Sequence, residues 1–477
     1  MAERQYDVIV IGAGSTGEVV AGRVARGGLS ALIIEAELVG GDCSYWACMP
    51  SKALLRPPQA LAAARSVAGA SQAVTGTLDV AAVLQRRDAF TAHWDDAGQV
   101  GWLRDNKIDF LRGHGALTGE RRVRVTNGSG ESELTARHAV VLCAGSRPAV
   151  PPVPGLAEAR PWTSRQATSA RAAPRSLMIL GGGVVGCEMA TAWRQLGTQE
   201  LTVVQRGGRL LPGYEPFVSD LVRQALEAGG VRVLTNRNAE RVQRGDDGVV
   251  QLTLAGGETI VADELLVATG RQPRTENIGL ETLGLKPGSW LEVDDSLQVK
   301  AVAGGWLYAA GDVNHRALLT HMGKYQARVC GDVIVARAAG SPEAADPVRW
   351  TRYAASADAA AVPQVVFTEP EVAAVGLTEA RARQRGMTAR AVDYEIGRVA
   401  GAALYADGYS GRARVVVDEA RGVIVGMTMV GPAVGELLHA ATIAVVGEVP
   451  LDRLWHAVPS YPTISEVWLR LLEALGL

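Results

Sequence analysis

Apolar and polar positions follow the same order in two separate stretches of the chain. In the first, an apolar, β-branched run at residues 6–11 is followed by glycines, a helical pattern and a second apolar run at 31–34. In the second, apolar runs at 176–180 and 201–204 flank the same arrangement. A helical pattern between two such runs predicts a βαβ unit with parallel strands. The sequence therefore predicts an α/β fold that contains two such units.

The first unit carries a Gly-x-Gly-x-x-Gly turn made by Gly12, Gly14 and Gly17. Gly12 permits the tight turn, Gly14 lets a pyrophosphate approach the backbone, and Gly17 lets the helix pack on the strand. The start of the helix then faces the phosphates. Glu35 ends the second strand and can accept a hydrogen bond from a ribose hydroxyl. Together these features predict a dinucleotide site.

The second unit repeats the glycine spacing with Gly181, Gly183 and Gly186. Its second strand ends in Gln205, which is followed by Arg206 and Arg209. An acid at this position suits the ribose of NAD, whereas the 2′-phosphate of NADP requires cations. We therefore predict that this site prefers NADPH. NADH remains the alternative if both arginines are only solvated surface residues.

Other parts of the chain predict further elements. Residues 48–66 have a helical pattern, although Pro57-Pro58 should break or kink the helix. Residues 81–105 predict another long helix, and residues 107–142 alternate like a meander of short strands. A stretch rich in Ala, Ser and Pro at 340–360 predicts a domain boundary, after which strands and helices alternate again.

Composition narrows the class of protein. A chain of 477 residues is too long for one core, so several domains are expected. The net charge of −2 gives no electrostatic case for binding nucleic acid or an anionic membrane, and no apolar run is long enough to predict a spanning helix. The polar first residues predict no signal peptide. Five cysteines are too few for a disulfide framework, so we expect a reducing, cytoplasmic setting.

Two of the five cysteines, Cys43 and Cys48, lie close together in the chain. On one straight helix their Cα atoms would be about 8–9 Å apart, whereas a disulfide tolerates about 7 Å at most. A bond between them therefore needs a distorted turn, and Pro50 suits the first turn of a new helix. Such a bond should be strained and reducible, as a working disulfide is. Two unrelated neighbouring thiols are the alternative.

The surrounding run, G-G-x-C-x-x-x-x-C-x-P-S-K, resembles the active site of the flavoprotein disulfide reductases. This family includes dihydrolipoamide dehydrogenase, glutathione reductase and mercuric reductase. The resemblance implies that Cys43 exchanges with the substrate and that Cys48 contacts the flavin. It also implies that Lys52 lies near the flavin and pairs with Glu188.

Three further segments resemble the same family. Gly145 lies in a run similar to A-T-G-S-x-P, and Gly270 lies in an A-T-G-R-x-P run. Asp312 lies in an A-x-G-D run, whose aspartate binds the ribityl chain of FAD in the family. The resemblance therefore implies FAD at the first dinucleotide site and a nicotinamide nucleotide at the second, with no metal site.

The C-terminal part resembles the family's interface domain and implies a homodimer in which each active site uses residues of the partner. Thiol-handling members carry H-P-T-x-x-E there, but this chain has Tyr461 in place of the histidine and keeps Glu466. Tyrosine has a pKa near 10 and seldom accepts a proton at neutral pH. Mercuric reductases also have this tyrosine but add a C-terminal cysteine pair, and here no cysteine follows Cys330. Mercury reduction is therefore disfavoured.

We predict an α/β protein with two Rossmann-like dinucleotide-binding domains and a C-terminal α+β dimerisation domain. The predicted domains are the first part of the FAD-binding domain at 1–152, the NAD(P)H-binding domain at 153–275, the second part of the FAD domain at 276–350 and the interface domain at 351–477. The predicted function is electron transfer from NADPH through FAD to the Cys43–Cys48 disulfide and then to a small-molecule disulfide or related acceptor. The alternatives are a dihydrolipoamide dehydrogenase, a mercuric-type reductase, a flavin-level quinone reductase or a non-enzymatic redox-responsive protein.

Overall fold

The computed structural model describes residues 4–477, so the first part of the polar N-terminal segment lies outside the described residues. The chain divides into two compact units, and each is built from three segments. The first comprises the residues up to Pro50, Asp88–Pro148 and Arg271–Ala359. The second comprises Ser51–Arg87, Ala149–Gly270 and Ala360–Leu477. The finer division into four domains remains a prediction.

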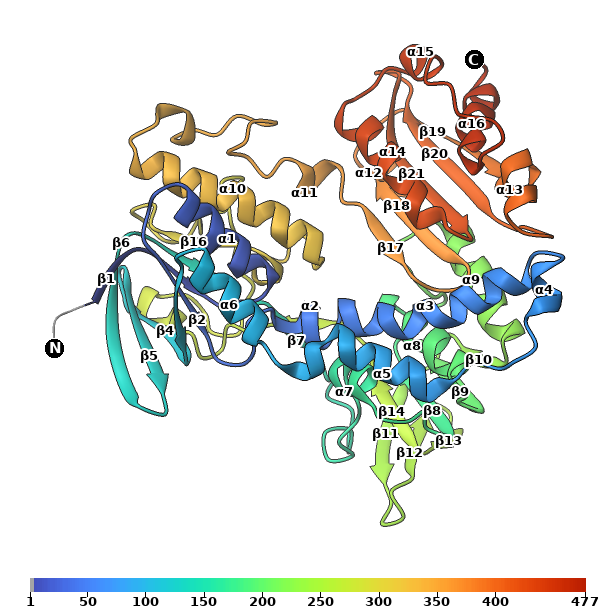
Figure 1. The fold of residues 1–477 in the computed structure, drawn as a ribbon, viewed down its shortest axis with the longest axis horizontal. Coiled ribbons are helices and arrows are strands. Elements are labelled where there is room, and N and C mark those ends of the chain that lie inside the picture. The colour runs from blue at the N-terminus through green and yellow to red at the C-terminus, as the bar shows by residue number, and fades with distance from the viewer. Residues whose placement is uncertain (1–3) are drawn as a thin grey trace. The chain divides into compact units, whose positions relative to one another are not determined.

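A seven-stranded mixed sheet forms the centre of the first unit (Figure 1). Its strands are β1 (Arg4–Ile11), β2 (Ala31–Glu35), β3 (Asp109–Arg112), β4 (His114–Gly119), β5 (Arg122–Asn127), β6 (Gly130–Leu142) and β16 (Leu307–Ala309). They run in the order β3-β2-β1-β6-β5-β4, with β16 also paired to β6. The pairs among β3, β2, β1, β6 and β16 are parallel, whereas β4, β5 and β6 form the antiparallel meander expected from the sequence.

Helices of the first unit cover this sheet, so its central strands are buried on both faces. Val8, Ile9 and Val10 of β1 are fully buried, which suits a parallel central strand. The helical elements are α1 (Ser15–Arg26), α2 (Gly41–Tyr45), α6 (Ala97–Asp105), α10 (Thr320–Ala338), η1 (Ala92–Trp94), η2 (Leu280–Leu283), η3 (Asp312–Asn314) and η4 (Pro342–Ala344). Figure 1 shows α1 lying beside α10. The segment that carries β16 and α10 thus belongs to the same core as β1.

The second βαβ unit lies in the second compact unit. Its parallel sheet has the order β10-β9-β8-β14, and a smaller antiparallel sheet has the order β11-β12-β13. The strands are β8 (Ser176–Leu180), β9 (Glu200–Val204), β10 (Val231–Leu234), β11 (Ala239–Arg244), β12 (Val250–Leu254), β13 (Thr259–Ala262) and β14 (Glu264–Val267). The helices are α7 (Ser164–Ser169), α8 (Val184–Gln195) and α9 (Pro216–Ala228). Every residue of β8 is buried, as expected of a central parallel strand.

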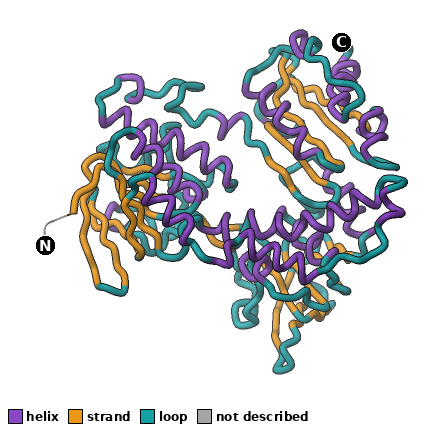
Figure 2. The backbone as a smooth tube through the Cα atoms, in the orientation of Figure 1, coloured by secondary structure: helices purple, strands orange, loops and turns teal. Residues whose placement is uncertain are grey.

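The C-terminal residues form a five-stranded antiparallel sheet, drawn in orange in Figure 2, in the order β17-β18-β21-β20-β19. Its strands are β17 (Gln364–Val366), β18 (Glu371–Gly376), β19 (Ala389–Glu395), β20 (Arg412–Asp418) and β21 (Val423–Gly431). The helical elements here are α11 (Ala357–Ala360), α12 (Glu379–Gln384), α13 (Ala400–Tyr405), α14 (Val434–Val446), α15 (Leu451–Leu454), α16 (Val467–Leu475), η5 (Ile396–Arg398) and η6 (Ile464–Glu466). Val366 and Val430 share a hydrophobic core with residues of the second βαβ unit.

The prediction of one helix over 81–105 was wrong, whereas that over 48–66 was right about the helix but not about a break at its prolines. The helix α3 (Cys48–Arg65) does not break at Pro57 and Pro58 but contains both. Its buried Leu54 and Leu55 belong to the core of the second unit, and this packing holds the helix where propensity alone would end it. The segment 81–105 is not one helix. It is α5 (Val80–Phe90) followed by η1 and α6, because the chain has positive φ angles at 92–94.

Three short elements complete the description: α4 (Ala70–Ala73), β7 (Ser146–Pro148) and β15 (Arg271–Pro273). The strands β7 and β15 pair antiparallel within the first unit. Within the part of the chain that the structure describes, no helix is both long and apolar enough to cross a bilayer.

Candidate active site

The two neighbouring cysteines lie on two different helices. Cys43 is in α2, which ends at Tyr45, and Cys48 is the first residue of α3. Trp46, with φ −137°, interrupts the helical path between them. Both thiols are reduced here, and each is partly buried. The distorted turn expected from the spacing is therefore confirmed, with Pro50 in the first turn of the new helix as predicted.

Hydrogen bonds connect these two thiols to each other and to α10. The Sγ atom of Cys48 lies 3.1 Å from the Oγ1 atom of Thr320, which begins α10. The pKa of Cys43 is raised, first because its side chain hydrogen-bonds Cys48 and second because it is buried. The proton therefore stays on Cys43, whose thiol donates to the sulfur of Cys48.

Lys52 and Glu188 form the ion pair expected from the sequence. The Nζ atom of Lys52 donates to Oε2 of Glu188 at 2.7 Å, and Glu188 is almost completely buried. The other carboxylate oxygen accepts from the backbone N–H of Phe367 at 3.1 Å. The ring of Phe367 lies 4.7 Å from the Lys52 ammonium, as a cation–π contact requires. Glu188 is thus fixed by two donors on opposite oxygens.

The first glycine turn has the geometry that the sequence predicted. Gly12 has φ +102°, and a Cβ there would lie 2.4 Å from the carbonyl oxygen of Cys143. A Cβ on Gly17 would lie 1.9 Å from the carbonyl oxygen of Gly12, so helix and strand approach more closely than any side chain allows. A Cβ on Gly14 would meet nothing within 4 Å, which leaves open space at the start of α1. A phosphate group fits this space.

The carboxylate of Glu35 lies beside the same turn and hydrogen-bonds its backbone. It accepts from the backbone N–H groups of Ala13 and Glu37, both at 2.7 Å. Burial raises its pKa from the usual range. The acid therefore lies beside the glycine turn, where a ribose hydroxyl would reach it.

The second turn repeats this arrangement at corresponding positions. Gly181 has φ +115°, and a Cβ there would lie 2.4 Å from the carbonyl oxygen of Ala268. A Cβ on Gly186 would lie 1.9 Å from the carbonyl oxygen of Gly181, while Gly183 again faces open space. The two turns therefore have the same backbone design.

Gln205 takes the place of Glu35 in the second turn. Its Oε1 atom accepts from the N–H of Gly182 at 2.9 Å, and its Nε2 atom donates to the carbonyl oxygen of Arg209 at 3.3 Å. The guanidinium of Arg209 donates to the carbonyl oxygen of Pro212 at 2.8 Å. Arg206 is exposed to solvent. The loop thus presents Arg206 outward, whereas Arg209 is partly held by the backbone.

Asp312 lies in a polar cluster that the sequence only partly predicted. Its carboxylate accepts from the hydroxyl of Ser146 and lies 3.6 Å from Nε of Arg271. Arg271 also contacts Asp42, next to Cys43, at 3.1 Å. Burial raises the pKa of Asp312. Ser146 and Arg271 stand in the A-T-G-type runs recognised in the sequence, so attention to the residue after each glycine would have found them.

The remaining predicted residues are two glycines, which matter for their backbone conformation, and two residues near the C-terminus. Gly145 has φ +71° and Gly270 has φ +136°, conformations that favour glycine. Tyr461 is 76% exposed in this chain. Glu466 is buried and accepts from Arg470, while among the described residues its Oε2 atom has no hydrogen-bond partner. The structure thus does not join Tyr461 to Glu466 by a hydrogen bond anywhere in its described range.

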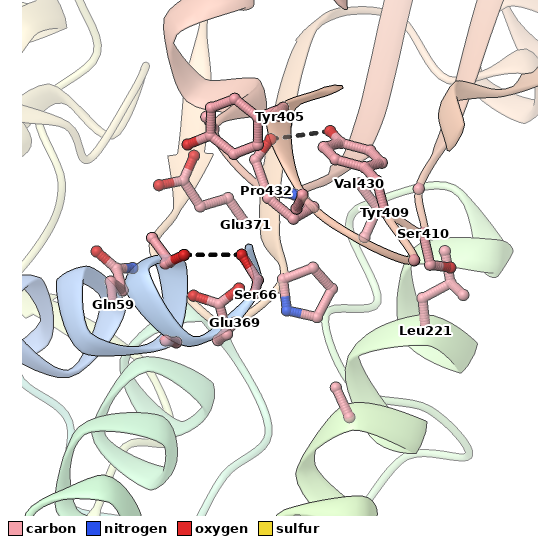
Figure 3. Close-up of a pocket in the computed structure, with 18 of the residues that line it drawn as sticks. Gln59, Ser66, Leu221, Glu369, Glu371, Tyr405, Tyr409, Ser410, Val430 and Pro432 are labelled. Atoms are coloured by element: carbon pink, nitrogen blue, oxygen red, sulfur yellow. Dashed lines mark hydrogen bonds between the residues drawn. The ribbon is translucent and has the colours of Figure 1, made fainter. Parts of the chain in front are cut away.

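A cavity of about 550 Å³ lies in the second unit, and no predicted site residue lines it. Figure 3 shows Gln59 of α3, Glu369 and Glu371 around it, and the hydroxyl of Tyr409 donating to the carbonyl oxygen of Pro432 at 2.8 Å. Burial raises the pKa of both glutamates. The cavity contains no cysteine, so it is not part of the redox site.

Comparisons with known proteins agree along the whole chain. A family model described as "Pyridine nucleotide-disulphide oxidoreductase" matches residues 6–340, and the model of its dimerisation domain matches residues 362–471. A dihydrolipoyl dehydrogenase of Rhizobium etli is 32% identical over 100% of this chain and 99% of its own length. A mercuric reductase of Staphylococcus aureus is 28% identical over 97% of this chain and 81% of its own. The solved HOCl-induced flavoprotein disulfide reductase RclA of Escherichia coli has the same fold, with a TM-score of 0.82 at 23% identity over 98% of this chain and 99% of that chain.

Proposed function

The chain belongs to the pyridine nucleotide-disulphide oxidoreductases, and we propose that it passes electrons from NADPH to the Cys43–Cys48 pair and on to a small-molecule disulfide. The predicted family and fold class are thereby confirmed. The enzymes of this family depend on FAD and use pyridine nucleotides. The matched dimerisation domain supports a homodimer. The specific nucleotide, the substrate and the residue roles are the proposal.

The observation that carries the proposal is the hydrogen-bonded cysteine pair between α2 and α3. Cys43 keeps its proton and hydrogen-bonds the sulfur of Cys48, so the two sulfurs are not equivalent. The acceptor sulfur of Cys48 suits the flavin side, while Cys43 exchanges with an incoming disulfide once it has lost its proton, because the thiolate is the nucleophile. Thr320 provides a hydroxyl 3.1 Å from Cys48 that stabilises negative charge on that sulfur.

FAD fits the first unit. Its pyrophosphate would lie at Gly14 and the start of α1, and Glu35 would hold the ribose of its adenosine part. Gly12, Gly17 and Gly145 would provide the backbone turns, and the buried carboxylate of Asp312 would accept from the ribityl hydroxyls. When bound, FAD supplies hydride acceptance from the nicotinamide and two-electron reduction of the disulfide.

NADPH fits the second unit better than NADH. The open space at Gly183, flanked by Gly181 and Gly186, would take its pyrophosphate. Gln205 is neutral and would not repel a 2′-phosphate, and Arg206 is exposed beside it. The second arginine of this loop, Arg209, would add to the positive potential around the 2′-phosphate. Gly270 would provide the backbone turn after strand β14.

Two further groups would complete the site. Lys52, fixed by Glu188, would place a cation near the flavin when the cofactor is bound. The exposed Tyr461 and the nearby Glu466 would reach the cysteines of a partner subunit, because the dimerisation domain carries them. A phenol donates a proton at neutral pH but seldom accepts one, so reduction of an acceptor is favoured over oxidation of a dithiol. A reducing compartment such as the cytoplasm suits a catalytic disulfide.

Anaerobic titration of the purified enzyme with NADPH tests the role of the pair. We expect a long-wavelength absorbance band at two-electron reduction in the wild type and its loss in Cys48→Ser. In Cys43→Ser, the matched control, no disulfide can form, so we expect the band before NADPH is added and its loss as the flavin takes up the electrons. Identical spectra in wild type and Cys48→Ser would remove Cys48 from the flavin side.

A dihydrolipoyl dehydrogenase is the alternative, and the similarity to the Rhizobium etli enzyme favours it. The absent histidine base at Tyr461 argues against it, because general acid–base assistance is typically worth about 10²–10⁴-fold. We expect slow oxidation of dihydrolipoamide at pH 7 and a gain in Tyr461→His. Tyr461→Phe should lower acceptor reduction if the phenol donates. Fast dihydrolipoamide oxidation by the wild type with NAD would favour the alternative.

A further inference from the structure

Gln326 is a fully buried polar residue that the proposed function does not use. It lies in α10, the helix that begins at Thr320 beside Cys48. A buried amide needs partners for both its oxygen and its nitrogen, because an unpaired polar group inside a protein is strongly destabilising. The partners of Gln326 therefore show which parts of the first unit it connects.

The side-chain oxygen of Gln326 holds the turn that carries Asp312. It accepts from the backbone N–H of Gly311 and from Nδ2 of Asn314, both at 2.8 Å. Gly311 directly precedes η3 and Asn314 ends it, while Asp312 is its first residue. Nδ2 of Asn314 also donates to the carbonyl oxygen of Ala309, in β16, at 3.1 Å. One buried oxygen thus fixes both ends of the turn.

The side-chain nitrogen of Gln326 contacts a buried acid from a later part of the chain. Nε2 donates to Oδ2 of Asp358, in α11, at 2.9 Å. The same oxygen accepts from Nη1 of Arg316 at 3.3 Å, and Nη2 of Arg316 donates to Asp295 at 2.6 Å. The side chain of Asp358 is 3% exposed, and its Oδ1 atom has no hydrogen-bond partner among the described residues. Gln326 and Arg316 are therefore the donors that compensate for the burial of this carboxylate.

Asp358 also determines which way round the amide of Gln326 lies. An ionised carboxylate accepts hydrogen bonds but cannot donate them, so it requires the nitrogen end of the amide. The oxygen end is then left for the two donors of the turn. With the amide reversed, its N–H groups would face the donors of Gly311 and Asn314, and its oxygen would face the carboxylate.

We propose that Gln326, oriented by Asp358, is a positioning residue for FAD, because it fixes η3 so that the Asp312 carboxylate is preorganised for the ribityl hydroxyls. This inference rests on the proposed function, since it uses the role given there to Asp312. A group held in its binding geometry before the ligand arrives loses less freedom on binding, which increases affinity.

The proposal extends the flavin site to the end of the first unit. Asp358 lies in the last segment of that unit, which ends at Ala359, and the matched dimerisation domain begins at residue 362. The residues that lead into the dimerisation domain thus orient the group that holds the flavin turn. Both hydrogen bonds to the turn and the one to Asp358 lie within the first unit.

The charges around Asp358 fix the behaviour expected of the wild type against pH. Burial, the largest cause, raises the pKa of Asp358 to about 6, and the charge of Asp295 raises it further, whereas Arg316 and Gln326 lower it. Tyr325 of α10 faces the same acid, whose charge adds to the effect of burial in raising the pKa of the phenol. When Asp358 takes up a proton, the unpartnered Oδ1 can hold it while Oδ2 keeps its hydrogen bonds. We therefore expect the FAD affinity of the wild type to vary little with pH.

Exchanging the amide of Gln326 for a carboxyl group tests the inference. FAD is removed from the full-length protein and titrated back, and its dissociation constant is read from flavin fluorescence, which requires neither NADPH nor turnover. In Gln326→Glu two carboxyl groups meet where a donor met an acceptor, so they must share a proton. We expect wild-type affinity at about pH 6, where the shared proton preserves the hydrogen bond. At about pH 9, where the like charges repel, we expect affinity lower by about 5–150-fold.

Three further variants keep the test decisive. Gln326→Glu combined with Asp358→Asn restores one donor and one acceptor with their positions exchanged, so it should recover most of the affinity and lose the pH dependence. Gln326→Leu should weaken FAD binding at every pH, and it decides the matter if the two carboxyl groups keep their shared proton up to about pH 9. Thr275→Val is the matched control, because Thr275 is equally buried in the same unit and donates to the carbonyl oxygen of Ser289 at 2.7 Å. It should keep wild-type FAD affinity even where its melting temperature falls as far as that of Gln326→Leu.

Two results would overturn the inference. One is a loss of affinity in Gln326→Glu that neither low pH nor Asp358→Asn repairs. The other is an affinity in Gln326→Leu no weaker than that in Thr275→Val, which would leave Gln326 only a structural role. Wild-type FAD affinity in Asp312→Asn would instead overturn the role that the proposed function gives to Asp312.

Discussion

The two glycine turns of this chain share a backbone but differ in the side chains placed on it. In both, a Cβ on the third glycine would lie 1.9 Å from the carbonyl oxygen of the first. In both, the side chain at the end of the second strand accepts from a turn N–H, at 2.7 Å for Glu35 and 2.9 Å for Gln205. We therefore expect the glycines to determine where a dinucleotide lies and the charge of one side chain to influence which dinucleotide is accepted.

The residue after the third glycine differs as well. It is Glu18 in the first turn and Cys187 in the second. Cys187 is fully buried, and its thiol donates to the carbonyl oxygen of Gly182 at 3.6 Å. Burial raises the pKa of Cys187 to about 12, so it stays neutral at physiological pH. Glu18, with a pKa of about 7, does not. One turn thus carries a titratable group where the other carries an inert one.

The largest expected effect is the loss of nucleotide binding when the third glycine of either turn is replaced, with a different nucleotide lost at each turn. Gly17→Ala should abolish FAD retention, and Gly186→Ala should retain FAD but lose most NADPH activity, because each Cβ collides with a carbonyl oxygen. Overpacking of this kind costs about 1–3 kcal/mol or more. Flavin content and steady-state rates measure both. Gly98→Ala, where a Cβ meets nothing within 4 Å, is the control. Equal flavin loss in both glycine variants would show that the turns are not independent.

The next effect concerns the phosphate contact at the second turn. Arg206→Ala should lower kcat/KM for NADPH by about 10–150-fold, since a hydrogen bond to a charged group contributes about 1.5–3 kcal/mol. The rate with NADH should hardly change. Arg209→Ala should have a smaller effect, because its guanidinium already donates to Pro212. A wild-type enzyme that prefers NADH would contradict this interpretation of the loop.

A smaller effect should follow from making the second turn resemble the first. Gln205→Glu keeps an acceptor for the Gly182 N–H but adds a charge that repels a 2′-phosphate. We expect KM to rise for NADPH and to fall for NADH, by about tenfold in their ratio. Glu35→Gln makes the opposite exchange and should leave the nucleotide preference unchanged. A Gln205→Glu enzyme with an unaltered ratio would mean that the arginines alone decide the preference.

The smallest expected effect is on how the stability of the folded protein changes with pH. The pKa of Glu18 is raised in the folded state, so the folded protein binds this proton more tightly than the unfolded chain does. Stability should therefore fall as the pH rises from the ordinary glutamate range, near 4.3, toward about 7. Glu18→Gln should flatten this part of the profile, whereas Cys187→Ser should leave its slope unchanged. Melting temperatures between pH 5 and 8 provide the measurement, and parallel profiles of wild type and Glu18→Gln would contradict it.

Much of this molecule follows from its sequence. Both βαβ units could be predicted because a glycine with a positive φ acts through its own backbone, as at Gly12 and Gly181. The break between Cys43 and Cys48 could be predicted because helix geometry excludes a bond along one straight helix. Family membership followed from short motifs of the same local kind.

Other features depended on contacts between residues far apart in the chain. Local propensity predicted a break or kink at Pro57-Pro58, but the helix, with Leu54 and Leu55 packed in the core, runs unbroken to Arg65. The contact of Thr320 with Cys48 joins two elements widely separated in sequence. The sequence shows Glu18 as an ordinary acid after a glycine turn, and its burial in the folded protein raises its pKa to about 7, against the lowering effect of Lys324. Desolvation depends on what surrounds a group in space, and tertiary structure alone decides that.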